Sequence, residues 1–272
     1  AHHKKRVVLL GQGLGPFLAL ELAYYARRAY PKVDFIALRE KRHGFKLLKN
    51  LYVDENRIHI TGDDALELAY RLRTDMIGQA LGINIRIASY SEVTDILAPK
   101  LRKAFNDFSQ ATPTDFLPIP ISISHERMSD LEAIRQLVGD EHVPPEEWTR
   151  IYDLPEDVIR QISRCRVVVT GSYHAAVFAL AQGIPVVGLA KSDYYLNKFL
   201  GLLDLFEVGI EVVILDGQTI DQRLTWAIRY LWENAETLRP TILSATEAQI
   251  EAGQRAYQTV FAPYQKDKHH DK

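Results

Sequence analysis

The sequence predicts an α/β fold with two parallel sheets. Strand-like and helix-like segments alternate along most of the chain, and the strand-like segments are continuous apolar runs. Such runs are typical of parallel strands that are covered by helices on both faces of the sheet. The pattern restarts near residue 79, so we expect one domain at 1–78, a second at 79–238, and a C-terminal helix and tail at 239–272.

The first expected domain contains short runs rich in Val, Ile and Leu, each followed by a segment with helical spacing. The expected strands are 6–10, 33–40 and 57–60, and the expected helices are 17–30, 41–51 and 63–73. Pro31 follows the first helix as a stop signal, and Asp63 or Asp64 is the expected cap of the third.

The second expected domain repeats this alternation. Its expected strands are 83–89, 114–122, 166–171, 184–190 and 211–215, and its expected helices are 91–108, 129–138, 154–165, 173–183 and 194–206. The prolines of 114–122 indicate a bend or an edge strand, Ser129 is an expected cap, and Pro155 suits a first helical turn. Residues 142–148 read as a loop. Residues 220–264 read as helical, with Pro240 as a break or kink.

The composition limits the class of protein. The 272 residues are 47% hydrophobic and 25% charged, as in soluble globular proteins, and the net charge of −2 gives no basic field for nucleic acid. Any anion site must therefore be local. Cys165 is the single cysteine, so no internal disulfide can form, and its apolar surroundings indicate a core residue. No apolar run reaches the roughly 18 residues of a spanning helix, and we expect a cytoplasmic protein.

The turn after the first strand, in the stretch LLGQGLGPF, is rich in glycine. Gly11, Gly13 and Gly15 stand between a strand and a helix, as in a dinucleotide-binding fingerprint. That fingerprint has its third glycine where Pro16 stands here, and Glu40 comes too late to bind a ribose. A tight turn before an exposed helix N-terminus, which can hold an anion, is the safer interpretation.

Basic residues occur at two expected strands. Arg39 ends a strand, where ligands of open α/β sheets bind, and its guanidinium can fork onto a phosphate or carboxylate. Asn84 and Arg86 share one side of another strand because side chains alternate. The structural alternatives are an Arg39–Glu40 pair, a pairing across domains, and an Arg86 that reaches solvent.

The passage VVVTGSYHAAVFALAQGIPVVGL contains one histidine among apolar and small residues. The helix after the strand should begin near Tyr173, which puts His174 in its first turn, at the positive end of the helix dipole. A neutral histidine there can donate a hydrogen bond to a phosphate, and a protonated one can act as a general acid. The structural alternative is a capping or packed histidine.

The stretch KSDYYLNKF follows the next strand and should lie at the same sheet edge as His174. Lys191 and Lys198 are candidate ligands for an anion, and Tyr194 and Tyr195 are candidates for stacking on a sugar. An ordinary surface position is the alternative for Lys198. The sequence shows no His, Cys and Asp cluster with metal-ligand spacing.

Taken in order, the GQGLGP turn, FIALRE, ITGDDALELA, LGINIRIA, TGSYHAAVFALAQGIPVVGL and YYLNKF resemble the polysaccharide pyruvyl transferase family. The resemblance spans most of residues 6–210. It implies an architecture like that of the GT-B glycosyltransferases, with a cleft between two Rossmann-like domains. Family members carry a longer segment before the GQGLGP-like turn, so the first domain is expected to be incomplete at its N-terminus.

The resemblance implies roles for residues near both expected strand ends. Arg39 and Glu40 match the family's strand-end arginine and acid. The resemblance therefore implies that Arg39 binds substrate and that Glu40 is a possible base. The family's G-(V/I)-x-x-R strand matches Gly82 to Arg86, which implies a substrate-binding role for Asn84 and Arg86.

The resemblance also assigns residues around the lone histidine. The family's Arg-x-His motif matches Ser172 to His174, so the histidine is kept as the implied general acid and the arginine is replaced by Ser172. Lys198 is the preferred counterpart of a downstream lysine, and Lys191 is the second choice. The implied substrate-binding residues of this region are Ser172, Tyr173, Lys191, Tyr194 and Lys198.

Members of this family move pyruvate from phosphoenolpyruvate onto a sugar of a cell-surface glycan as a ketal. The resemblance implies phosphoenolpyruvate as co-substrate with no other cofactor or metal, and a glycan or lipid-linked sugar as acceptor. It implies a role in exopolysaccharide biosynthesis for the cell envelope, near the inner face of the membrane. Since Ser172 replaces the family arginine, two alternatives stay open: a GT-B glycosyltransferase that uses a nucleotide-sugar, and a non-catalytic fragment that binds a sugar or anion.

Overall fold

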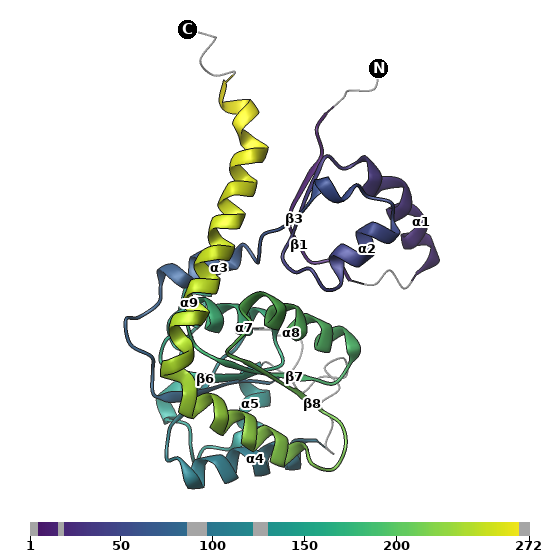
Figure 1. Ribbon diagram of the computed structural model, residues 1–272. Coiled ribbons are helices and arrows are strands. Elements are labelled where there is room, and N and C mark those ends of the chain that lie inside the picture. Colours follow the sequence, from purple (N-terminus) through teal and green to yellow (C-terminus); the bar gives the residue numbers. More distant parts are fainter. Residues whose placement is uncertain (1–4, 16–18, 86–96, 122–129, 267–272) are drawn as a thin grey trace. The chain divides into compact units, whose positions relative to one another are not determined.

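The structure, a computed structural model, describes residues 5–15, 19–85, 97–121 and 130–266, with side chains as far as residue 262. The chain forms two compact units (Figure 1). Unit 1 consists of residues 1–66 and 247–272, and unit 2 consists of residues 67–246. This division differs from the sequence-based boundaries, because residues 67–78 belong to unit 2 and the residues from 247 onward belong to unit 1.

Unit 1 is built on a parallel sheet with the order β1-β2-β3. Its strands are β1 (Val8–Gln12), β2 (Phe35–Leu38) and β3 (Ile58–Ile60), and the helices that follow them are α1 (Leu20–Ala29), α2 (Gly44–Asn50) and α3 (Ala65–Arg71). The last of these begins in unit 1 and continues into unit 2. Of the two expected caps, Asp63 or Asp64, it is the Asp63 carboxylate that accepts a hydrogen bond from the Ala65 N–H, at 3.0 Å.

Strand β2 is buried on both faces, as its unbroken apolar sequence FIAL requires. Ile36 and Leu38 join a cluster with Leu48 of α2 and other residues of that side. Phe35 and Ala37 alternate to the opposite face, where they pack with Ala256 and Val260 of the C-terminal helix. The first sheet therefore needs residues from both ends of the chain to cover it.

Unit 2 is built on a second parallel sheet with the order β5-β4-β6-β7-β8. Its strands are β4 (Ala80–Asn84), β5 (Phe116–Pro118), β6 (Cys165–Thr170), β7 (Val186–Ala190) and β8 (Ile210–Ile214). Within the sheet, the chain moves to one side after β4 and to the other side from β6 onward. The space outside the carboxyl ends of β4 and β6 is thus the topological switch point, where doubly wound α/β proteins bind ligands.

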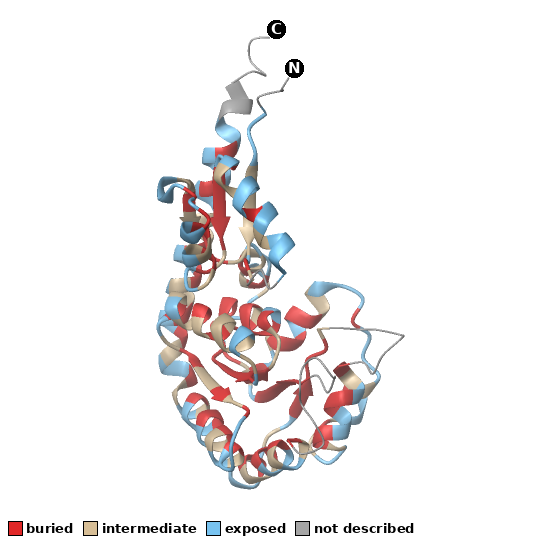
Figure 2. Cartoon of the chain, turned by 90° about the vertical axis from the view of Figure 1, so that its right-hand side faces the viewer, coloured by how far each residue is buried: buried red, intermediate tan, exposed pale blue. Residues whose placement is uncertain are grey.

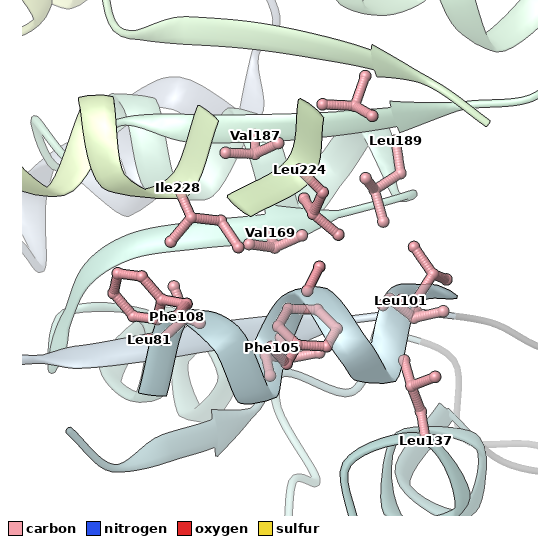
Figure 3. Close-up of a cluster of buried hydrophobic side chains, with 14 of the residues drawn as sticks. Leu81, Leu101, Phe105, Phe108, Leu137, Val169, Val187, Leu189, Leu224 and Ile228 are labelled. Atoms are coloured by element: carbon pink, nitrogen blue, oxygen red, sulfur yellow. The ribbon is translucent and has the colours of Figure 1, made fainter. Parts of the chain in front are cut away.

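Helices cover both faces of the second sheet (Figure 1). They are α4 (Ala98–Ala111), α5 (Asp130–Val138), α6 (Pro155–Ile162), α7 (Tyr173–Ala181), α8 (Asp193–Phe206) and α9 (Ile220–Lys266). Side chains of α4, α5 and the first part of α9 form one core with the sheet, including Phe105, Leu137 and Leu224 (Figure 3). Helices α6, α7 and α8 pack on the other face. Strands β4, β5 and β7 of this sheet are buried and β6 is nearly so, whereas the edge strand β8 is only partly buried (Figure 2).

These observations confirm the predicted α/β class with two parallel sheets, and β5 is an edge strand as its prolines indicated. Strand β4 begins at Ala80, earlier than expected, because the run QALGIN pairs with β6 from its first residues. The expected loop at 142–148 contains a 3-10 turn at Pro145–Trp148, and α9 continues through Pro240 without a break. Cys165 is fully buried, as expected for a core residue. The Ser129 cap lies outside the described residues.

Candidate functional site at the switch point of unit 2

The carboxyl ends of β4 and β6 are joined by side chains. Asn84 and Thr170 are register partners in neighbouring strands, and the Thr170 hydroxyl donates a hydrogen bond to the Asn84 Oδ1 at 2.8 Å. Both residues are buried, with exposures of 2% and 0%. A polar pair enclosed in this way is stable only when its hydrogen bonds are made, so it fixes the spacing of the two strand ends.

The Asn84 amide extends this network to the third strand end. Its Nδ2 donates to the Ile119 carbonyl at 2.8 Å and to the Asp130 carboxylate at 3.3 Å. The same carboxylate accepts the Ile121 N–H at 2.9 Å. Asn84 thus uses both amide hydrogens within the protein, and this supports a positioning role rather than the direct substrate contact that the sequence suggested.

The same network sets where α7 begins. The Ser172 N–H donates to the Thr170 hydroxyl at 2.8 Å, and the Gly171 N–H donates to the Asn84 carbonyl at 3.1 Å. The helix then starts at Tyr173, as predicted, and the Ser172 side chain does not cap it. The first-turn amides of a helix lack acceptors within the helix, so the positive end of α7 lies at the switch point.

A lysine surrounded by tyrosines lies beside this helix start. The Lys198 Nζ of α8 is 4.2 Å from the ring centroid of Tyr194, 5.6 Å from that of Tyr195 and 5.9 Å from that of Tyr173. An ammonium within about 6 Å of an aromatic ring is attracted by the ring's negative face. Within the described part of the chain, Lys198 makes no ion pair with a carboxylate, so its charge is available to an anionic ligand.

His174 is exposed at the start of α7, and its ring contacts that of Tyr173 edge to face at a centroid distance of 5.6 Å. Tyr173 is 5% exposed, and its ring is thus close to both the imidazole and the Lys198 ammonium. The structure thereby brings together Ser172, Tyr173, His174, Tyr194 and Lys198, which the sequence nominated separately. Lys191 lies just before α8 and is exposed.

The corresponding edge of unit 1 is organised differently. Arg39 follows β2, and its Nη1 lies 3.4 Å from a carboxylate oxygen of Asp63, which follows β3. The guanidinium also lies against the backbone at Gly13, where a Cβ atom would be 2.3 Å from Arg39 Nε. Its counter-ion is therefore Asp63 rather than Glu40, a partner that the sequence analysis did not identify.

Glu40 acts as a cap in this structure. Its side chain is buried, with 7% exposure, and its two carboxylate oxygens accept the backbone N–H groups of His43 at 3.1 Å and Gly44 at 3.2 Å. These bonds hold the start of α2. Because both carboxylate oxygens are used in these hydrogen bonds, the structure favours a structural role for Glu40. Its role as a general base stays a prediction.

Several positions remain outside this geometry. Arg86 lies outside the described residues. Thr170 and Asp130 were missed by sequence reasoning; a threonine ending an apolar strand was the available signal for the first, whereas nothing in the sequence connects Asp130 to β4.

In the described ranges, no group of three or more His, Cys, Asp and Glu residues could hold a metal ion. No helix in those ranges is both long and apolar enough to cross a membrane.

Comparison with solved structures shows the fold. A UDP-N-acetylglucosamine 2-epimerase described as putative, from Listeria monocytogenes, matches with a TM-score of 0.62 at 12% identity, over 96% of this chain and 69% of its own. Anabaena HepE in complex with UDP matches with a TM-score of 0.60 at 15% identity, over 95% and 72%. A glycosyltransferase from Rickettsia africae matches with a TM-score of 0.54 at 12% identity, over 91% and 69%. The chain thus has a GT-B-type fold.

Comparison with curated proteins gives no match. The sequence model of the family described as polysaccharide pyruvyl transferase matches residues 1–193, which include both strand-end regions and the helix that carries His174. Most of the chain is covered by this match, so the chain belongs to the polysaccharide pyruvyl transferase family.

Proposed function

We propose that this chain transfers pyruvate from phosphoenolpyruvate to a sugar of a cell-surface glycan, forming a ketal. The single observation that carries the proposal is the cluster at the switch point of unit 2. It combines an ammonium that has no carboxylate partner among the described residues, an exposed imidazole and a helix N-terminus at the place where α/β sheets bind ligands. Family membership supplies the reaction class.

The proposed reaction needs no oxidation or reduction. A proton adds to the methylene carbon of the enol, and the neighbouring carbon becomes electrophilic. One sugar hydroxyl attacks that carbon, the C–O bond to phosphate breaks, and a second hydroxyl closes the ketal. The two hydroxyl protons balance the one taken up by carbon and the one that leaves with phosphate.

The residues of the cluster suit these steps. Phosphoenolpyruvate concentrates several negative charges on a small body, and a lysine together with helix amides is a common arrangement for binding such an anion. The exposed His174 is the candidate acid that protonates the methylene carbon. The tyrosines limit the positions open to the Lys198 ammonium, so the charge is held in place before the substrate arrives.

A second candidate is a glycosyltransferase-type reaction with a nucleotide-sugar. The observation that favours it is the likeness to proteins solved with UDP, among them Anabaena HepE and a Staphylococcus aureus protein named MnaA. The same helix start could hold a diphosphate. Because Ser172 replaces the family arginine, a nucleotide-sugar stays open as the donor in place of phosphoenolpyruvate.

Ligand-induced changes in melting temperature separate the two candidates. We expect phosphoenolpyruvate to raise the melting temperature of the whole chain, and UDP or UDP-N-acetylglucosamine to leave it unchanged. The shift should disappear in Lys198→Ala and persist in His174→Gln, because the imidazole is assigned to proton transfer rather than to binding. Stabilisation by UDP and not by phosphoenolpyruvate would favour the second candidate instead.

Turnover tests the assigned acid directly. With acceptor glycan and phosphoenolpyruvate present, His174→Gln should reduce the release of inorganic phosphate by about 100-fold, the usual scale for loss of a general acid. Release at the wild-type rate would remove His174 from the mechanism.

A further inference from the structure

Unit 2 has a pocket that shares no residue with the switch-point cluster. It has a volume of about 400 Å³, within the range of small-ligand sites, and it is open to solvent. It lies between β8, at the edge of the sheet, and the first turns of α9. Its lining residues are Glu211, Val212, Val213, Thr219, Gln222, Arg223, Trp226 and Ala227.

One wall of the pocket carries the carboxylate of Glu211. Within the described part of the chain, the side chain of Glu211 makes no hydrogen bond or ion pair, although it is partly buried. Burial accordingly raises the pKa of the Glu211 carboxyl above its ordinary value. A half-buried acceptor of this kind is stabilised by a ligand that donates hydrogen bonds.

The opposite wall carries a fixed arginine. The Arg223 Nη2 donates to the Ile214 carbonyl at 2.8 Å and lies 3.3 Å from the Asp216 carboxylate. Its Nη1 makes no hydrogen bond to any residue that the structure describes, and the side chain is 40% exposed. The guanidinium is thus held through Nη2 while the Nη1 donors remain unused, and its charge is already balanced by Asp216.

Two exposed aromatic residues lie on α9, and one of them, Trp226, lines the pocket. The Trp226 ring is stacked on that of Tyr230 at a centroid distance of 5.3 Å and an interplanar angle of 3°. The two residues are 58% and 40% exposed, so aromatic surface is left in water. An exposed aromatic ring attracts a ligand whose own flat side is made of C–H groups, because aromatic rings carry negative charge on their faces.

We propose that this pocket binds a neutral saccharide, with a sugar ring lying on Trp226 and its hydroxyl groups bonded to Glu211, Gln222 and Arg223. A sugar hydroxyl both donates and accepts, which matches a carboxylate, an amide and a guanidinium donor placed around an aromatic face. The uncompensated Glu211 and the neutralised Arg223 disfavour a phosphate or a nucleotide, since the pocket offers no net positive charge.

This inference does not rest on the proposed reaction. It concerns binding alone, and it holds for any enzyme or binding protein that must retain a glycan beside a separate reactive site. Its test measures binding without phosphoenolpyruvate or UDP, so its failure and the failure of the proposed function are distinguishable.

The experiment screens the whole chain against an array of immobilised neutral oligosaccharides of glucose, galactose, mannose and N-acetylglucosamine. Binding to the best oligosaccharide is then measured in solution by tryptophan fluorescence. We expect Trp226→Ala and Glu211→Gln each to weaken that binding by about tenfold or more, the scale expected when an aromatic contact or a charged hydrogen bond is lost. The control is Phe261→Ala, which removes an exposed ring stacked on Tyr257 farther along the same helix, at 46% exposure and away from the pocket.

Each result decides the matter. Loss of binding in both pocket variants with retention in Phe261→Ala supports the site. Absence of binding to every array sugar, equal binding by all variants, or displacement of the sugar by UDP overturns it. Concentration-dependent self-association that is lost in Trp226→Ala, without sugar binding, also overturns it, because the aromatic face would then be an interface between copies of the chain.

Discussion

The basic side chains at the carboxyl ends of the two sheets differ in whether a carboxylate pairs with them. In unit 1, Arg39 lies between the Gly13 backbone and the Asp63 carboxylate, and Glu40 caps α2. In unit 2, Lys198 is surrounded by aromatic rings and lacks a carboxylate partner among the described residues. The first edge satisfies its charges internally and the second leaves one for a ligand. Similar positions in two related sheets thus differ in how much charge remains available.

The largest expected effect comes from removing each cation in turn. Lys198→Ala should reduce kcat/KM for phosphoenolpyruvate by about 100-fold or more, because a positioned charge is lost from the site. Arg39→Ala should reduce it by about tenfold or less, since Asp63 already offsets the guanidinium. Phosphate release measures both variants, with circular dichroism as a check of folding. A greater loss in Arg39→Ala would reverse the comparison.

The next effect concerns the hydroxyls at the two edges. Thr170→Val should lower the free energy of unfolding of unit 2 by about 2 kcal/mol, because it leaves the buried Asn84 Oδ1 and the Ser172 N–H without their partner. Thr61→Val is the matched change in unit 1, where the hydroxyl makes only longer bonds of 3.3 and 3.4 Å. It should cost less than about 1 kcal/mol. Urea unfolding compares the two, and equal costs would contradict the special role of the Asn84 network.

The two units should also differ in acid sensitivity. Burial lowers the pKa of His59, whose ring stacks on Phe35 at 4.1 Å in unit 1. The unfolded histidine, with a pKa of about 6.5, then binds protons more readily than the folded one, so stability present above that pH is lost as the pH falls below it. Hydrogen exchange of unit 1, corrected for intrinsic rates, should accelerate between about pH 7.5 and pH 5.5, and His59→Gln should remove this dependence.

In unit 2, Glu147 is expected to lose its stabilising contribution only at a lower pH than His59 does in unit 1. Burial alone would raise the pKa of its carboxyl, but hydrogen bonds from Gln161 at 2.6 Å and Arg164 at 2.7 Å outweigh it and lower the pKa. Its contribution is therefore kept until the pH falls below about 4.3, the value of an unfolded glutamate. If hydrogen exchange of unit 2 accelerated near pH 6 together with that of unit 1, the two units would not differ in acid sensitivity.

The smallest effect is expected at the strand-end glycines. A Cβ at Gly13 would lie 2.3 Å from Arg39 Nε and must displace the guanidinium, whereas a Cβ at Gly171 would meet only the Leu189 carbonyl at 3.9 Å. Gly171→Ala should therefore change stability by less than about 0.5 kcal/mol, and Gly13→Ala should cost about 1 kcal/mol. Thermal unfolding checks both, and a larger cost for Gly171→Ala would show that the unit 2 edge has less room than the structure indicates.

Much of the fold was predictable because it follows from local patterns. The apolar run RVVVT predicted a buried strand, and the turn at Gly171 and Ser172 predicted the start of α7. The restart of the pattern near residue 79 predicted the second sheet. These signals depend on neighbours in sequence and on covered parallel strands. The start of β4 was placed too late because its pairing with β6 involves residues far away in the chain.

The candidate site was predictable only in part. Residues of α7 and α8 were nominated because they follow adjacent strands, and the structure brings Tyr173 and Lys198 together. Burial and pairing were not visible in the sequence. Asn84 and Glu40 had the chemistry of ligand-binding residues, yet their polar groups are used by the protein itself. The Trp226 pocket escaped notice because its residues read as an ordinary strand and the ordinary first turns of a long helix.

The 47-residue helix α9 has a consequence for how the chain matures. Unit 2 is one uninterrupted stretch, so it can fold on the ribosome as soon as its last strand and the start of α9 have emerged. The face of β2 that carries Phe35 and Ala37 must instead wait for Ala256 and Val260, which are synthesised after all of unit 2. The sheet of unit 1 is thus covered later than unit 2, and a premature stop before those residues would leave it exposed to proteases and chaperones while unit 2 is already folded.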